Sequence, residues 1–247
     1  MSTPVVLITG ALTGIGRAAA LAFAKSATVV VSGRREAEGK ALESKLRGLG
    51  AEAAFILADV RHEEHVRSLV DQTVARFGRL DVAVNNAGTE GKPGPLTEQT
   101  PDSYAGMFDT NVLGTLLSLK HELRVMQPQR SGSIINISST MGQRGAANLA
   151  LYTASKHAVE GLTKSTALEA APFGVRVNAV APGPTDTAML DRLTGTPDKK
   201  AAFYDSVPLK RGAKPEEIAD AVVFLASDKA SFITGQIIRV NGGKTAT

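Results

Sequence analysis

The sequence contains no cysteine and no tryptophan, and aromatic residues make up only 4% of its 247 positions. Without cysteine the chain has no disulfide, no thiol nucleophile and no thiolate ligand for a metal. This absence is compatible with a reducing compartment, and we expect the protein in the cytoplasm.

Long apolar runs are also missing. Arg17 interrupts the apolar stretch after the first strand-like segment, and no segment reaches the roughly 20 apolar residues of a membrane-spanning helix. The opening residues, MSTPVVLITG, lack the charged and apolar regions of a secretory signal. We expect a soluble protein that does not enter a membrane.

The charge excess is small, because 28 basic residues stand against 24 acidic ones, a formal net charge of +4. The basic residues form short doublets, and few aromatic side chains are available to stack on bases, so no nucleic-acid partner is expected. His62 and His65 are three positions apart, one short of the zinc-binding H-E-x-x-H spacing, and no metal site is predicted. His121 is expected on a helix surface.

Short runs rich in β-branched residues alternate with longer stretches of helical periodicity. The near-continuous apolar character of the runs is typical of strands buried on both faces. Strand and helix in regular alternation predict right-handed crossovers and a parallel sheet. Expected strands cover 5–9, 28–32, 53–58, 81–85, 133–138, 175–181 and 236–240, and expected helices cover 14–25, 35–48, 62–77, 101–127, 151–171 and 215–226.

The predicted fold is α/β: a single doubly wound Rossmann-type domain over 1–247, with a central parallel sheet of about seven strands flanked by helices on both faces. No internal repeat or linker divides the chain. The longest irregular stretches are 87–100, 139–150 and 182–210. They are expected to gather over one edge of the sheet, outside the carboxyl ends of the strands, where such folds bind ligands.

The segment TGALTGIG, residues 9–16, follows the first expected strand and opens the first helix. Gly10 can end the strand in a tight turn, Gly14 allows a ligand to approach the backbone, and Gly16 allows the helix to pack on the sheet. The free N–H groups of the helix and the hydroxyl of Thr13 suit a pyrophosphate. A merely tight turn is the alternative, but the strand–turn–helix context favours a dinucleotide site.

The end of the second expected strand bears on the choice of cofactor. Folds that select NAD place an acid there to bind the ribose 2′-hydroxyl, whereas here Gly33 is followed by Arg34 and Arg35. Two guanidinium groups suit a phosphate on the 2′-oxygen, so we expect NADP(H) rather than NAD(H); two solvated arginines are the alternative. Asp59 and Val60 could flank the adenine, unless Asp59 simply caps the next helix.

The segment YTASK, residues 152–156, puts the phenol of Tyr152 and the ammonium of Lys156 on one face of an expected helix. Glu160 follows Lys156 by a further four positions. Taken alone, the segment is therefore better interpreted as a solvated salt bridge beside a tyrosine than as a catalytic pair. The motifs elsewhere in the chain change that balance.

Taken together, the motifs resemble those of a classical short-chain dehydrogenase/reductase. Each segment alone is weak evidence, but their joint order and spacing are highly specific. The resemblance spans nearly the whole chain and rests on TGALTGIG, NNAG at 85–88, Asn111 within FDTNVLG, INISS at 135–139, YTASK, PGPTDT at 182–187 and the tail at 215–243.

The resemblance implies that Tyr152 is the general acid/base and that Ser139, rather than Ser138, binds and orients the carbonyl oxygen. Lys156 would hold the nicotinamide ribose and stabilise the phenolate, and Asn111 would fix a water in a proton relay. A free phenol has a pKa of about 10, and a cation one helical turn away in a partly dehydrated site is expected to lower it.

In the same family the NNAG segment stabilises the sheet and lies along the cofactor, and PGPTDT wraps its nicotinamide end. Asn85 is a further candidate in the first of these, with plain turn chemistry as the alternative. The expected cofactor-binding set is Gly10, Thr13, Gly14, Ile15, Gly16, Arg34, Arg35, Asp59, Val60, Asn86, Ala87, Gly88, Tyr152, Lys156, Pro182, Gly183, Thr185 and Thr187.

A substrate lid is expected at about 187–210, where Met189, Leu190, Leu193, Phe203 and Tyr204 either line an apolar pocket or pack as ordinary helix residues. Arg144 and the loop 89–95 border the same region. The resemblance also implies a homo-oligomer, a tetramer or dimer. The leading prediction is an NADP(H)-dependent oxidoreductase that interconverts a small-molecule ketone or aldehyde and an alcohol. A cofactor-binding sensor or scaffold without turnover, and a lyase or epimerase on the same fold, are the alternatives.

Overall fold

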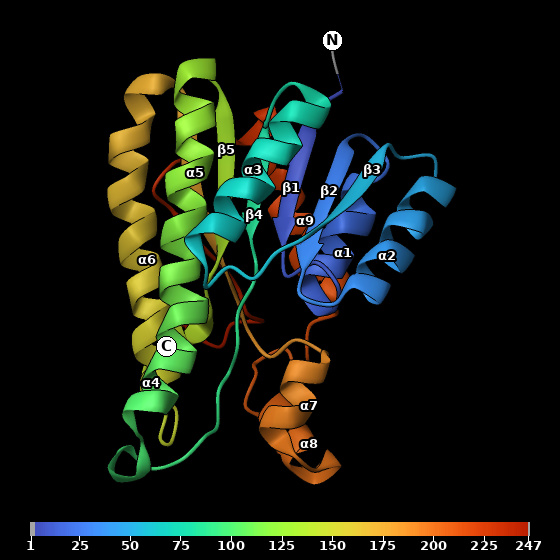
Figure 1. Cartoon of the computed structure of the whole chain (residues 1–247). Coiled ribbons are helices and arrows are strands. Elements are labelled where there is room, and N and C mark those ends of the chain that lie inside the picture. Colours follow the sequence, from blue (N-terminus) through green and yellow to red (C-terminus); the bar gives the residue numbers. More distant parts are fainter. Residues whose placement is uncertain (1–2, 247) are drawn as a thin grey trace.

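Seven parallel strands form the central sheet of the computed structural model, which describes residues 3–246 (Figure 1). Their spatial order is β3-β2-β1-β4-β5-β6-β7, and every neighbouring pair is parallel. The strands are β1 (Val5–Thr9), β2 (Thr28–Gly33), β3 (Ala53–Leu57), β4 (Val82–Asn85), β5 (Gly132–Ile137), β6 (Val175–Pro182) and β7 (Ile237–Val240). The predicted doubly wound sheet is confirmed.

Helices cover both faces of this sheet. One face carries α1 (Gly14–Phe23), α2 (Glu36–Gly48) and α9 (Pro215–Ala226), and the other carries α3 (Glu63–Phe77), α5 (Gly114–Gln129) and α6 (Ala150–Ala170). Short 3-10 turns connect some elements, at Leu96–Glu98, Thr140–Gly142, Ala171–Phe173 and Asp228–Ala230.

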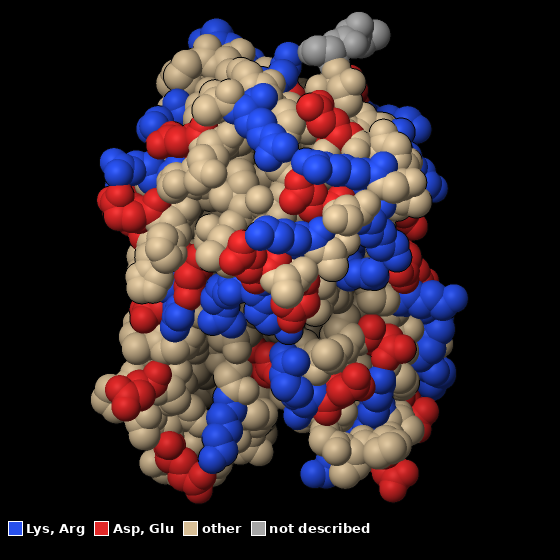
Figure 2. All heavy atoms as spheres, turned by 45° about the vertical axis from the view of Figure 1, so that its right-hand side comes forward, with Lys and Arg blue, Asp and Glu red and all other residues tan. Residues whose placement is uncertain are grey.

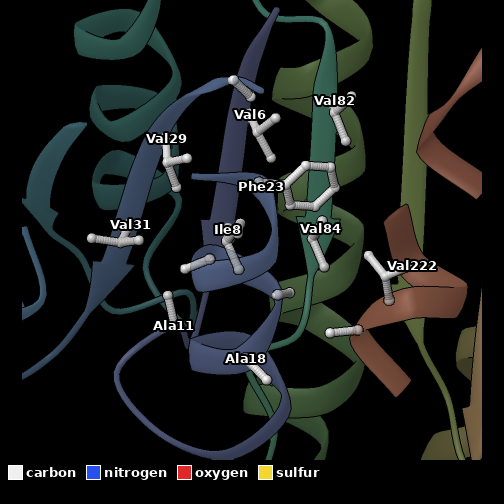
Figure 3. Packing of buried hydrophobic residues seen from close by; sticks show 14 of the residues in the cluster. Val6, Ile8, Ala11, Ala18, Phe23, Val29, Val31, Val82, Val84 and Val222 are labelled. Carbon is white, nitrogen blue, oxygen red and sulfur yellow. The ribbon is translucent and has the colours of Figure 1, made fainter. Parts of the chain in front are cut away.

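Both faces of the sheet are buried, which explains why the strand sequences are apolar at nearly every position. Consecutive side chains of a strand point to opposite faces, and in β1 Val6 and Ile8 pack with α1 and α9 (Figure 3). Val5 and Leu7 join the cluster beneath α3, α5 and α6. A strand with a helical layer on each side has no polar face to present.

Two regions differ from the sequence-based expectation. The predicted helix over 101–127 is α4 (Pro101–Phe108), a π-helical turn (Asp109–Leu113) and α5, which together form one interrupted rod. The stretch predicted as irregular over 182–210 contains α7 (Ala188–Thr194) and α8 (Pro197–Asp205).

His121 is not on a helix surface, as had been expected. It is 4% exposed, and its Nε2 atom lies 3.2 Å from Glu63 Oε1 at the start of α3. The α5 face that carries it packs against α3 rather than against water.

None of the helices within residues 3–246 combines the length and the apolar character that crossing a membrane requires. Over the same residues, no group of three or more histidine, aspartate or glutamate side chains is suitably placed to hold a metal ion.

Candidate active site

A cavity of about 550 Å³ opens at the carboxyl ends of the strands, where the order of the sheet reverses between β1 and β4. The chain continues from β1 to α1 on one face of the sheet and from β4 toward α5 on the other, so the crevice is a consequence of the topology. In Figure 1, α7 and α8 lie beyond this end of the sheet. In Figure 2 the same end of the molecule is notched, and basic side chains stand on both sides of the notch.

The glycine turn after β1 forms one wall of the cavity. Gly10 and Gly14 adopt left-handed φ angles of +62° and +55°, which L-residues with a Cβ rarely adopt. A Cβ on Gly10 would lie 2.7 Å from the Ala87 Cα, and one on Gly14 would lie 3.2 Å from the Thr187 Cγ2. This is a backbone cradle at a helix N-terminus that any side chain would fill, and it fits a pyrophosphate.

Thr13 and Gly16, also in the glycine turn, lie at the start of α1. Thr13 is the N-cap of α1, but its side chain makes no capping hydrogen bond and lies on the cavity wall. Gly16 does not line the cavity; a Cβ there would overlap the Asn86 side chain and the Gly10 carbonyl. The absence of a Cβ allows α1 to approach Asn86 and the Gly10 carbonyl closely.

Arg34 and Arg35 line the cavity at the end of β2. Arg35 is half-exposed, and its Nε lies 3.3 Å from Glu38 Oε1. Neither guanidinium is buried in a structural network, so both can turn toward a ligand at this wall.

Asp59 and Val60, after β3, also line the cavity, but Asp59 does not cap α3, whose N-cap is His62. The Asp59 carboxylate accepts from Arg61 Nη2 at 2.6 Å. The Arg61 hydrogen bond is the main reason that the Asp59 pKa lies below its ordinary value, and the charge of Arg34 adds to it. The capping interpretation is therefore wrong.

The NNAG segment divides into two roles. Asn86 Nδ2 donates to the carbonyl oxygens of Gly10 at 2.9 Å and Thr9 at 3.2 Å, and so ties the end of β4 to the glycine turn. Asn85 points away from the cavity and donates through Nδ2 to Glu122 Oε2 and Asn136 Oδ1, each at 3.0 Å. The structure thus gives Asn85 a place in the buried polar network and not a cofactor contact.

Tyr152 and Lys156 lie on one face of α6 and both line the cavity. Lys156 Nζ is 5.7 Å from the centroid of the Tyr152 ring and donates to the Ile137 carbonyl at 2.9 Å. No ion pair joins Lys156 to Glu160, which instead pairs with Arg239 on β7. Because Lys156 and Glu160 are both buried, the solvated salt bridge is the wrong interpretation of this segment.

Burial is the largest influence on the pKa values of Tyr152 and Lys156. It raises the pKa of Tyr152; a hydrogen bond with Ser139 lowers that pKa, and the charge of Glu90 raises it. Burial also lowers the pKa of Lys156 to about 8. The expectation that the lysine lowers the phenol pKa is therefore not met in the protein alone, where burial raises that pKa, because desolvation disfavours the charged forms of both side chains.

Ser139 lies at the start of the turn after β5, and its Oγ accepts from Met141 N at 3.2 Å. Its hydroxyl lies on the cavity wall beside Tyr152. Ser138 also borders the cavity, but its Oγ donates to Glu160 Oε1 at 2.9 Å. The Ser138 hydroxyl is therefore bound to Glu160, whereas the Ser139 hydroxyl accepts from a backbone N–H.

Asn111 lies in the π-helical turn and does not line the cavity. Its Oδ1 accepts from Thr89 N at 2.8 Å, and its Nδ2 donates to Thr89 O at 2.9 Å and Ser155 Oγ at 3.1 Å. A Cβ on Gly88 would lie 3.3 Å from Asn111 Oδ1 and 3.7 Å from Lys156 Nζ. Asn111 thus approaches Lys156 across Gly88, with its side-chain amide already engaged.

The α7 side of the cavity brings in two residues that the sequence analysis did not name individually. Glu90, 8% exposed, accepts from Arg192 Nε at 2.7 Å and from Nη2 at 3.2 Å. The two residues join the loop after β4 to α7, and both line the cavity. No spacing signal connects them, because they are 102 positions apart.

Other expectations for this side are met in part. Thr187 is the N-cap of α7, and its Oγ1 accepts from Leu190 N at 3.5 Å. The cavity is lined by Met189, Leu190, Leu193 and Phe203, but Tyr204 and Arg144 are not among its lining residues. Tyr204 lies against Gly212, with its hydroxyl 3.4 Å from Asp186 Oδ1.

The expected cofactor set is brought together with one exception. All of its residues line the cavity except Gly16. Of the expected catalytic set, Ser139, Tyr152 and Lys156 line it and Asn111 lies behind Gly88.

Comparison with known proteins places this architecture in a family. A family profile described as enoyl-(acyl carrier protein) reductase matches residues 10–245. The cis-4-hydroxycyclohexanecarboxylate dehydrogenase of Sinomonas cyclohexanicum is 41% identical over 98% of this chain and 96% of its own length. The A-factor type gamma-butyrolactone 1'-reductase (1S-forming) of Streptomyces virginiae is 43% identical over 98% and 95%.

Among solved structures, that of ElxO with NADP bound covers 100% of both chains, with a TM-score of 0.93 and 36% sequence identity. The profile spans most of the chain, and the relatives match it over nearly their full lengths. The chain belongs to the classical short-chain dehydrogenase/reductase family.

Proposed function

We propose that the protein is an NADP(H)-dependent oxidoreductase that interconverts a ketone or aldehyde and an alcohol, with Tyr152 as the general acid/base. One observation carries the proposal. The Tyr152 phenol, the Ser139 hydroxyl and the Lys156 ammonium line the same cavity as the glycine turn and the arginine pair.

The residues of the chain divide the work between them. A bound nicotinamide cofactor supplies or accepts the hydride. In reduction, Ser139 orients the carbonyl oxygen and Tyr152 donates its proton to that oxygen; in oxidation, the Tyr152 oxygen takes the proton back. Lys156 has a pKa of about 8, so it is mainly protonated at neutral pH, and its charge stabilises the phenolate that remains after proton transfer.

The preference for NADP(H) rests on Arg34 and Arg35. Both line the cavity where the chain leaves β2, and no carboxylate stands at Gly33 to bind a ribose hydroxyl. A 2′-phosphate there would accept charge-assisted hydrogen bonds from planar guanidinium groups. A relative whose solved structure carries NADP supports the same choice.

We further propose a cytoplasmic homo-oligomer, a dimer or tetramer. Its support is the family and the exposed apolar side chains of Leu168 and Phe232, which are 78% and 102% exposed. Light scattering on the purified protein would report its mass directly.

A turnover assay tests the main proposal. Purified protein is mixed with NADPH or NADH and a panel of ketones, aldehydes and alcohols that includes cyclohexane carboxylates and lactones, the classes named in its relatives. We expect carbonyl-dependent loss of reduced-cofactor absorbance, faster with NADPH. Tight NADPH binding without turnover of any substrate would instead favour a sensor or scaffold.

A further inference from the structure

Glu160 lies one helical turn beyond Lys156 on α6, 5% exposed. Three hydrogen bonds converge on its carboxylate. Ser138 Oγ donates to Oε1 at 2.9 Å, Arg239 Nη2 donates to Oε2 at 2.8 Å, and Arg239 Nη1 donates to Oε1. A bidentate guanidinium–carboxylate pair of this kind fixes orientation as well as distance.

Arg239 also contacts the backbone of residues 138–142, the segment after β5 that contains Ser139 and is called the catalytic segment below. Its Nη1 donates to the Ser139 carbonyl at 3.4 Å, so one guanidinium from β7 binds both the α6 carboxylate and the residue expected to orient the substrate. The Arg239 side chain is 23% exposed and that of Glu160 is 6% exposed. This shielding from water makes the pair more rigid than a surface ion pair.

The turn after Ser139 is built around the same carboxylate. A Cβ on Gly142 would overlap both Glu160 Oε1 and Ser138 Oγ, so glycine lets the turn close onto the pair. Glu160 and Arg239 do not line the reaction cavity. They border a second hollow, together with Gly142.

We propose that Glu160 and Arg239 form a positioning pair that holds Ser139 against Tyr152 from behind the catalytic segment. The proposal rests on the proposed acid/base role of Tyr152. Neither residue touches the reacting atoms; the pair acts by fixing the Ser138 side chain and the Ser139 backbone. Because Lys156 and Glu160 are on the same helix, the pair also fixes the segment relative to the lysine.

A merely structural role for Arg239 is the competing explanation, and Arg176 provides the matched control. Arg176 on β6 binds main-chain oxygens through its guanidinium, donating to Leu225 O at 2.8 Å and Ser227 O at 3.2 Å. It lies at the amino-terminal end of its strand, away from the cavity. Arg176→Lys therefore reports what the loss of a structural guanidinium does.

The first measurement is the titration of Tyr152 itself. The chain has three tyrosines and no tryptophan, so phenolate absorbance, taken as the difference from the matching Tyr152→Phe protein, isolates this residue. Arg239→Lys keeps the charge but cannot make the bidentate pair and reach Ser139 as well. Of the charged groups near the ring, Lys156 and Glu90 remain unchanged in every variant.

We expect Arg239→Lys and Ser139→Ala each to raise the Tyr152 midpoint by about half a pH unit or more. Ser139→Ala removes the hydroxyl that lowers the phenol pKa, and Arg239→Lys lets that hydroxyl shift away from the phenol. The Tyr152 midpoint of the double variant, which combines Arg239→Lys with Ser139→Ala, should equal that of Ser139→Ala alone. The midpoint of Arg176→Lys should equal that of the parent protein. A parent-like midpoint in Arg239→Lys would overturn the proposal.

The second measurement is a double-mutant cycle on kcat. Arg239→Lys should lower kcat roughly tenfold in the parent background and less than about twofold in the Ser139→Ala background, with the Kd of NADPH unchanged. Equal losses in both backgrounds would show that Arg239 does not act through Ser139. If Arg239→Lys does not fold, the paired variant Glu160→Gln with Arg239→Gln removes both charges together and takes its place.

The phenolate titration and the turnover measurements test this proposal and the proposed function separately. A protein that binds NADPH but turns over no carbonyl would contradict the oxidoreductase function, and the phenolate titration would still decide whether the pair positions Ser139.

Discussion

At the residue scale, the most unusual environment outside the cavity is that of Glu122 on α5. It is 1% exposed, and Asn85 donates to its Oε2 at 3.0 Å. Burial raises its pKa from the ordinary 4.5 to about 8, and the Asn85 hydrogen bond offsets only part of this. Between these pH values the folded state binds a proton that the unfolded chain releases, so the free energy of unfolding falls as pH rises.

Glu122→Gln removes this titration and leaves a side chain that can still accept from Asn85. The free energy of unfolding of the parent protein should fall between about pH 4.5 and 8 by up to about 1.4 kcal/mol per pH unit, and the variant should lose that slope and be more stable at pH 8. Urea denaturation at a series of pH values measures both slopes. Glu64→Gln, at an exposed position of α3, is the control. Parallel slopes for Glu122→Gln and the parent protein would contradict the assignment.

Single residues were predictable from the sequence where local order carries the information. Tyr152, Lys156 and Ser139 were found because motifs fix their spacing along the chain. The partner of Glu160 was not found, because a four-residue helical spacing shows that Lys156 and Glu160 share a face but not that Arg239 approaches from β7. The Glu90–Arg192 contact was missed for the same reason: it is made through the fold and not along the sequence.

At the element scale, strands and long helices were predicted to within a few residues, because continuous apolar strands and amphipathic helices have clear periods. The π-helical turn at Asp109–Leu113 was not predicted, since one extra residue per turn barely alters an apolar pattern. The sequence does carry a signal for α8. Thr196 followed by Pro197 is an N-cap and first-turn proline, the same pattern that begins α4 at Thr100 and Pro101.

The contact between Glu90 and Arg192 attaches α7 to the loop after β4. Arg192→Gln should raise the KM for the carbonyl substrate about fivefold, the equivalent of about 1 kcal/mol, because α7 is held less firmly over the cavity. Thermal stability should also fall, because the Glu90 side chain is only 9% exposed and loses its charged partner. Arg124→Gln, which removes an exposed ion pair with Asp71, is the control. An unchanged KM in Arg192→Gln would mean that the pair does not hold the lid.

At the scale of the whole molecule, the parallel sheet explains how distant motifs come to share one cavity. The carboxyl ends of all seven strands described in residues 3–246 lie at one edge, and the glycine turn, the arginine pair, NNAG, the Ser139 segment and PGPTDT each follow a strand. The sequence therefore predicted where these segments meet. It did not predict that Asn85 turns away from the cavity or that burial raises the phenol pKa, because both depend on packing between layers.

The arginine pair should decide which cofactor the molecule binds. Changing Arg34 and Arg35 to alanine together should weaken NADPH binding by about 10- to 100-fold, because charge-assisted hydrogen bonds to the 2′-phosphate are lost. The Kd of NADH should change little, and it serves as the internal control. Equal weakening of both cofactors, measured by fluorescence titration, would indicate a general loss of the site rather than of phosphate recognition.

The most direct test of the account is Tyr152→Phe, which removes one oxygen and keeps the ring that packs in the cavity. NADPH binding and thermal stability should remain close to those of the parent protein, while kcat with an identified carbonyl substrate should fall by about 10²- to 10⁴-fold, the usual contribution of a general acid/base. Turnover near the parent rate in that variant, with the cofactor bound normally, would contradict the assignment of Tyr152 as the proton donor.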